Sequence, residues 1–235
     1  IFGSRVFSGG ALAAGGAMFG MSGLELLSTQ KLQLVDALSP LHAGLIISAM
    51  ALSAIPTSIL GGATLHRLGF LPLISGGFLL MATGMTLLLA TRGETLALLV
   101  VALVLTGLGA GLAMSVSSTA IINAAPLHRT GMAAGVEAVS YEFGTLISIA
   151  LTGTLVPLLM ARELPPHLAE LGTDALHHPA SHATAASAYN AGYLSTIGGL
   201  ACFALLLAAI TAWCFRDNPK SGDPHAANQQ KDRSP

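Results

Sequence analysis

The chain has 235 residues, of which 53% are hydrophobic and 9% are charged. Soluble domains contain about 25% charged residues, so this chain carries too little charge to cover a globule in water. The formal net charge of −1 provides no basic surface for a nucleic acid, so no nucleic-acid partner is expected. The composition therefore predicts a protein that is surrounded by a lipid bilayer.

Six apolar stretches are each long enough to cross a bilayer, which takes about 20 mostly apolar residues. They cover residues 6–28, 44–65, 71–90, 96–123, 132–160 and 193–215. Charged and turn-forming residues lie in the breaks between them. The predicted fold class is therefore all-α: a polytopic membrane protein with six transmembrane helices.

The six stretches form one transmembrane region, residues 1–215, followed by a hydrophilic tail, residues 216–235, that is expected to be disordered. A long polar outer loop, residues 162–192, separates the last two stretches. Short helices at residues 167–176 and 183–193 would form either a small cap or an extension of the last span. Because the chain starts at Ile1, we expect it to be a fragment of a longer protein.

Lysine and arginine residues favour the cytoplasmic side of a membrane protein, and here they fall unevenly on the two sides. With Arg5 inside, the inner side carries seven basic residues, which are Arg5, Arg67, Arg129, Arg216, Lys220, Lys231 and Arg233. The outer side carries three, which are Lys31, Arg92 and Arg162. We therefore expect both ends of the chain to be cytoplasmic.

Pairs of glycines spaced four residues apart recur in the apolar stretches. They are Gly16 with Gly20, Gly107 with Gly111, and Gly131 with Gly135. Small residues at this spacing let membrane helices approach closely, so each pair predicts a tight contact with another helix. Such contacts either hold the helices together or slide during transport, and the spacing alone does not separate these roles.

The stretch at residues 132–160 contains two acids, Glu137 and Glu142, in an otherwise apolar sequence. A charge at the centre of a bilayer costs several kcal/mol and marks a proton or ion pathway by default. At 1.5 Å per residue, Glu142 lies about 15 Å from Met132, in the middle of a hydrocarbon core about 30 Å thick. Glu137 lies about 7 Å from Met132. For both acids, a purely structural role is the alternative.

Glu137 and Glu142 are about 140° apart around the helix, so they do not form a coupled pair. Tyr141 lies on the face of Glu137, where its hydroxyl group could donate a hydrogen bond to that carboxylate. Burial favours a neutral carboxyl group, so Glu142 is expected to load and release a proton as its access to water changes. A third acid, Glu25, lies about 28 Å along the first span, where it is either a solvated interfacial residue or a cation attractor at the outer mouth.

The sequence contains none of the common enzyme motifs, such as a phosphate loop, a Gly-x-Ser-x-Gly elbow or a Cys-x-x-Cys pair. His178 and His182 have the spacing of helical metal ligands, but Pro179 lies between them and no cysteine is near. An exposed histidine-rich loop is the preferred interpretation. We therefore expect no enzymatic activity, no cofactor and no metal site.

Two further segments are recognisable, residues 32–45 (LQLVDALSPLHAGL) and residues 131–135 (GMAAG). The first is similar to an outer-loop pattern of the fourteen-helix branch of the major facilitator drug–proton antiporters. The second resembles the start of the penultimate helix in that branch. The acids at Glu137 and Glu142, with Tyr141 between them, are similar to the subgroup that exports quaternary ammonium compounds and methyl viologen.

The resemblance implies that the chain is the last six helices of a transporter in the inner (plasma) membrane, a partial major facilitator fold. It implies that Glu137 and Glu142 handle protons and lipophilic cations, and that the missing N-terminal helices are partners of these six. The segment that starts at Gly62 resembles an inner-loop motif of the family, but the sequence departs from it at two positions. His66 replaces an acid of the motif, and Phe70 replaces a basic residue. Relatives can also carry an acid within residues 44–65, where this chain has none, so proton coupling is expected to rest on Glu142.

The combined interpretation is the C-terminal part of a proton-coupled exporter of lipophilic cationic drugs. Its candidate proton- and substrate-binding residues are Glu142, Glu137, Tyr141 and Glu25. Two alternatives stay open, namely another small-solute secondary transporter and a non-transporting membrane scaffold. Acids at the bilayer centre argue against the scaffold.

Overall fold

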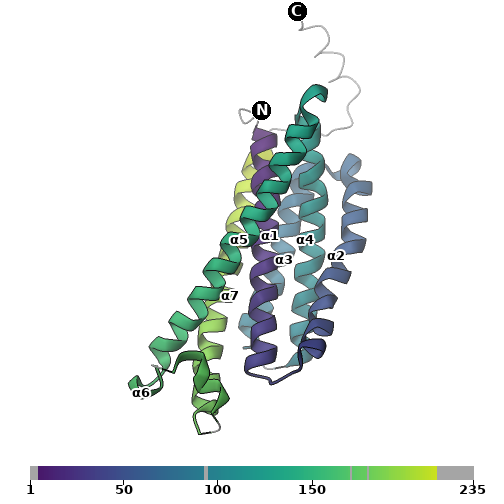
Figure 1. The fold of residues 1–235 in the computed structure, drawn as a ribbon. Helices are drawn as coiled ribbons and strands as arrows, with labels where there is room; N and C mark the ends of the chain where they lie inside the picture. The colour runs from purple at the N-terminus through teal and green to yellow at the C-terminus, as the bar shows by residue number, and fades with distance from the viewer. Residues whose placement is uncertain (1–4, 93–94, 170, 179, 216–235) are drawn as a thin grey trace, which may run out of the picture.

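The structure, a computed structural model, describes residues 5–92, 95–169, 171–178 and 180–215, and every regular element in them is helical (Figure 1). Within these residues, six helices are long and apolar enough to cross a membrane. They are α1 (Arg5–Leu34), α2 (Pro40–Leu68), α3 (Phe70–Ala90), α4 (Leu96–Ala124), α5 (Thr130–Glu163) and α7 (His182–Phe215). The predicted all-α fold with six spans is therefore confirmed, while the predicted disordered tail lies outside the described residues.

All six long helices extend beyond the apolar stretches that predicted them, and α7 does so by the most. α1 continues past residue 28 to Leu34, and α5 runs from Thr130 to Glu163. α7 begins at His182, so the helix predicted at residues 183–193 is an extension of the last span. Hydropathy marks the part of a helix that lies in hydrocarbon, whereas alanine-rich turns such as the start of α7 continue the helix beyond it.

Short helices fill the connections on either side of α5. The 3-10 helix η1 (Leu127–Arg129) precedes α5, and the four-residue α6 (Pro166–Ala169) and the 3-10 helix η2 (Gly172–His177) follow it. The single helix predicted at residues 167–176 is therefore wrong. Gly172 has a φ of +54°, a left-handed conformation that a continuous right-handed helix does not allow. η2 packs against α7 and buries Ala175 and Leu176.

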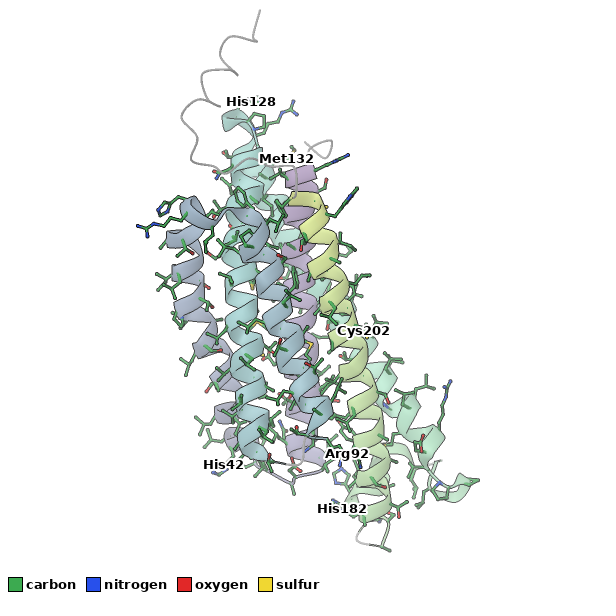
Figure 2. All side chains as sticks on the ribbon, turned by 180° about the vertical axis from the view of Figure 1, so that it is seen from behind. His42, Arg92, His128, Met132, His182 and Cys202 are labelled. Carbon is green, nitrogen blue, oxygen red and sulfur yellow. The ribbon has the colours of Figure 1, made fainter. Side chains whose placement is uncertain are left out.

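Four helices form a row in the order α5, α1, α4, α2, and α7 and α3 lie behind it (Figure 1). α4 packs closely on α2 and α3, α1 packs on α5, and α7 packs on α3, α1 and α5. Figure 2, seen from behind, shows His128 and Met132 at one end of the bundle and His42, Arg92 and His182 at the other. Successive long helices therefore run in opposite directions.

The first three long helices and the last three form an inverted repeat. Ser58 of α2 donates a hydrogen bond to the Gly111 carbonyl of α4 (3.3 Å), and Ser148 of α5 donates one to the Phe19 carbonyl of α1 (2.6 Å). α1 and α4 point in opposite directions along the bundle, as do α2 and α5. Inverted repeats of three helices are a feature of several transporter folds.

Glycines lie at the places where neighbouring helices approach one another most closely. A Cβ atom at Gly107 or Gly111 would collide with the backbone of α2, as the sequence predicted for this pair. Gly16 and Gly20 also lie in close contacts, against Leu207 and Met81 respectively. For the third pair, Gly131 and Gly135, the predicted contact is not found within the described chain, because a Cβ atom at either meets no described atom within 4 Å. That face of α5 is uncovered in the described chain.

Candidate functional site

Helix α5 carries three of the four candidate residues, and its contact with α1 fixes how it is turned. Gly144 packs so closely against the Gly15 carbonyl that any larger residue would collide with it. One turn further along, the buried Ser148 donates its hydrogen bond to the Phe19 carbonyl. These contacts point one face of α5 at α1 and leave the opposite face outward.

Glu137 and Tyr141 form the hydrogen-bonded pair that their spacing predicts. The Tyr141 hydroxyl group donates to Glu137 Oε1 at 2.9 Å, and both side chains are half-buried. Tyr141 packs against an apolar cluster contributed by α1, α4 and α5, which includes Phe7 and Ile121. The pair therefore faces α4 and α1, and the tyrosine ring holds the carboxylate in one position.

Glu142 lies on the outward face of α5. It is exposed, and its neighbours on that side are apolar, including Val139 (54% exposed) and Leu146 (62% exposed). Among the described residues, no hydrogen bond or ion pair to Glu142 is found. It lies about 18 Å from the start of α5 at Thr130, at 1.5 Å per residue. A carboxyl group at this depth and on this face has no partner within the described chain.

Glu25 is exposed on α1 and does not join the other acids. Ser22 of α1 donates to Thr145 of α5 at 3.4 Å, and the two helices run in the same direction. Glu25 lies about one turn beyond that contact, and Glu142 lies about one turn before it. Because α1 continues to Leu34, Glu25 is also about 14 Å from the end of its helix, farther than its predicted place near the outer surface.

His178 and His182, whose spacing would suit metal ligands only within one helix, do not share a helix. η2 ends at His177 and α7 begins at His182, so His178 lies in the turn between them. Within the described residues, no group of three or more histidine, cysteine, aspartate or glutamate residues could hold a metal ion.

Lys31 lies at a different place from the one that the sequence predicted. Lys31 was predicted to be an outer charge in a break between spans, but it lies in the last turn of α1 and is 7% exposed. Its Nζ atom is 3.1 Å from Asp36 Oδ2, in the turn that leads to α2. Two opposite charges five residues apart at the end of an apolar helix were the available signal for this pair.

The chain matches the family model described as Major Facilitator Superfamily over residues 6–234. It is 31% identical over 150 residues to the multidrug resistance protein Stp of Mycobacterium tuberculosis, covering 64% of this chain and 28% of the relative. It is 32% identical over 157 residues to the methyl viologen resistance protein SmvA of Salmonella typhimurium, covering 66% of this chain and 32% of the relative. For the multidrug efflux pump LfrA of Mycolicibacterium smegmatis, the identity is 29% over 150 residues, covering 63% and 30%.

The aligned region thus covers less than a third of each relative's length. The family model, in contrast, matches almost all of this chain, and the described helices supply six candidate membrane spans. The chain belongs to the Major Facilitator Superfamily, a family of membrane transporters and not of enzymes.

Proposed function

We propose that this chain is the C-terminal part of a proton-coupled exporter of lipophilic cations, in which Glu142 carries the proton. The supporting observation is an acid on an outward, otherwise apolar face of a membrane-spanning helix. Such an acid is costly in hydrocarbon and is typical of proton and ion pathways. The names of the relatives, which refer to multidrug and methyl viologen resistance, support the substrate class.

Helices outside this chain would complete the site. Glu142 would face hydrocarbon if these six helices stood alone, at a cost of several kcal/mol. The proposed cover is the N-terminal helices of the same transporter, in keeping with the small share of each relative that aligns. Gly135 and Gly131 precede Glu142 by two and three turns and share its face. The open space beside them would admit a closely packed helix.

The proposed cycle uses the change in charge of Glu142. When the site opens outward, a proton binds to Glu142, removes its charge and so weakens the attraction for the bound cation, which leaves. When the site opens inward, Glu142 releases the proton and attracts the next cation. Glu137, held by Tyr141, forms one wall of the cation site.

The proposed location is the inner (plasma) membrane, with the Arg5 and Arg129 end of the bundle in the cytoplasm. Single cysteines in a cysteine-free full-length protein test this orientation. We expect an impermeant thiol reagent added to intact cells to label Ala183→Cys, at the exposed start of α7, and not Arg67→Cys, at the end of α2. The opposite labelling pattern would reverse the orientation.

The variant Glu142→Gln tests the proton-carrying role because glutamine keeps the shape of the side chain but does not titrate. In the full-length protein we expect normal membrane insertion and loss of efflux driven by a pH gradient, measured with a fluorescent lipophilic cation in vesicles. Glu142→Asp should keep part of the activity. Glu137→Gln should keep proton-driven exchange but narrow the range of exported cations.

Two controls accompany this experiment. Cation binding is measured for the same variants. This separates loss of the coupling between proton and cation transport from loss of the cation-binding site. If Glu142→Gln supports wild-type proton-driven exchange at normal expression, the carboxyl group is structural and the proposed role is wrong. An absence of cation binding and efflux in the wild-type protein would instead overturn the proposed substrate class.

A further inference from the structure

An apolar groove runs along the outside of the bundle between α1, α5 and α7. Its first part has a volume of about 600 Å³, and its walls include Leu12, Phe143 and Ile147. Gly15 and Gly144, which meet where α1 crosses α5, lie at its floor. The groove exists because two helices that touch through glycines leave a channel beside the contact.

A second part of about 400 Å³ continues the groove between α5 and α7. The two parts share Phe19, Leu151 and Phe203. The rings of Phe19 and Phe203 lie 4.5 Å apart between centroids, which marks the junction. The groove thus has two sections that meet at an aromatic pair.

The first section is about as long as one leaflet is thick, and it passes the level of Glu142 near the bilayer centre. Along α5 it extends from Ser140 to Leu151, about 16 Å at 1.5 Å per residue. Half of a hydrocarbon core about 30 Å thick is about 15 Å. A helix is about 10 Å wide with its side chains, and a single acyl chain is a thinner occupant for a section of this length.

The Arg5 end of the groove carries residues typical of a membrane interface. Ala11, the lining residue closest to the start of α1, is about 9 Å from Arg5 along the helix. The Arg5 guanidinium group lies over the Trp213 ring at 5.4 Å from its centroid. Trp213 is 62% exposed, as expected for an interfacial aromatic residue. Guanidinium groups bind phosphate oxygens well, so this end suits a lipid headgroup.

We propose that the groove is a binding site for a bilayer phospholipid. One acyl chain lies in the section lined by Leu12, Phe143 and Ile147, and the headgroup phosphate lies at the Arg5–Trp213 end. This site is separate from the acids of α5, because neither Glu137 nor Glu142 lines the groove. The inference therefore stands or falls independently of the proposed efflux function.

Photolabelling of the full-length protein tests the site. The protein is reconstituted in vesicles of phosphatidylethanolamine and phosphatidylglycerol that contain a phospholipid with a diazirine in its acyl chain. We expect saturable adducts on the groove-lining parts of α1, α5 and α7. Ile147→Trp, which fills the groove, should lose most of this labelling. Leu205→Trp is the control, since Leu205 has similar exposure (46%, against 49% for Ile147) but does not line the groove.

Leu12→Phe fills the same section of the groove from the opposite wall. It replaces Ile147→Trp as the test variant if Ile147→Trp fails to fold. Equal labelling of the filled variants and the wild type would overturn the proposal. Labelling that is absent from the groove in the wild type would also overturn it and would indicate that other helices cover this face. Displacement of the adducts by tetraphenylphosphonium would reassign the groove to a lipophilic cation.

Discussion

Helices α2 and α5 occupy equivalent places in the two repeats, but only α5 carries acids. Ser58 of α2 corresponds to Ser148 of α5 through their matching hydrogen bonds, so Leu52 stands where α5 has Glu142. Leu52 is 64% exposed on the outward face of α2, and Glu142 is exposed on that of α5. The same helical framework therefore accepts leucine at this place, and the acid is not needed to build the bundle.

The two helix crossings also reach the same closeness with different glycines. On the α5 side, Gly15 and Gly144 contribute one glycine from each helix. On the α2 side, Gly107 and Gly111 both belong to α4. Both crossings therefore keep the helix backbones close and include a serine hydrogen bond, whereas the outward faces differ, with Leu52 on α2 and Glu142 on α5.

The largest expected effect comes from closing the approach of α5 to α1. Gly144→Val places a side chain against the Gly15 carbonyl, and neither backbone can move aside without separating the helices. We expect little folded protein in the membrane, measured by size-exclusion chromatography of the full-length protein in detergent. Gly76→Val is the matched control, because a Cβ atom there meets nothing within 4 Å. Equal yields of the two variants would contradict this account of the crossing.

The next prediction tests whether the outward face of α2 meets lipid. Leu52→Glu gives α2 the acid that α5 has at the equivalent position. If the face of Leu52 lies in hydrocarbon, the acid should cost about 2.5–3.5 kcal/mol, seen as lower thermal stability and poorer insertion. Glu142→Leu should not lower stability. A Leu52→Glu protein as stable as the wild type would place water or protein against this face.

A smaller effect is expected at the end of α1, where the repeats differ in charge. Lys31 is buried beside Asp36, whereas Asn123, at the equivalent place in α4, is exposed. Asp36→Asn should cost about 1–3 kcal/mol in thermal unfolding, because it removes the partner of a buried charge. Asn123→Ala should change stability by less than about 0.5 kcal/mol. Similar shifts for both variants would mean that the ion pair contributes nothing.

The smallest predicted effect separates the two equivalent serines. Ser148 is fully buried and donates to α1 at 2.6 Å. Ser58 is half-buried, donates to the Ala54 carbonyl of its own helix at 2.8 Å, and lies 3.3 Å from the Gly111 carbonyl of α4. Ser148→Ala should cost about 1 kcal/mol, and Ser58→Ala about 0.5 kcal/mol. Thermal unfolding of both variants in one detergent gives the ranking. The reverse order would show that the α2 crossing depends more on its serine than the α5 crossing does.

Features that depend on one helix alone were predictable from the sequence. The hydrogen bond from Tyr141 to Glu137 follows from a spacing of four residues. The separation of Glu137 from Glu142 around α5 follows from the same geometry. Helix ends were predictable only roughly, because Leu34 and His182 lie beyond the apolar stretches that hydropathy detects.

The sequence by itself determined the six spans and the Glu137–Tyr141 pair, because hydropathy and a repeat of 3.6 residues act within one stretch of chain. Only the tertiary structure decided that Gly107 touches α2, that Gly135, with the same spacing, touches no described helix, and that Lys31 is buried. It also decided that Glu142 points away from the bundle. These features depend on which helices lie side by side, and spacing within one helix does not identify its neighbours.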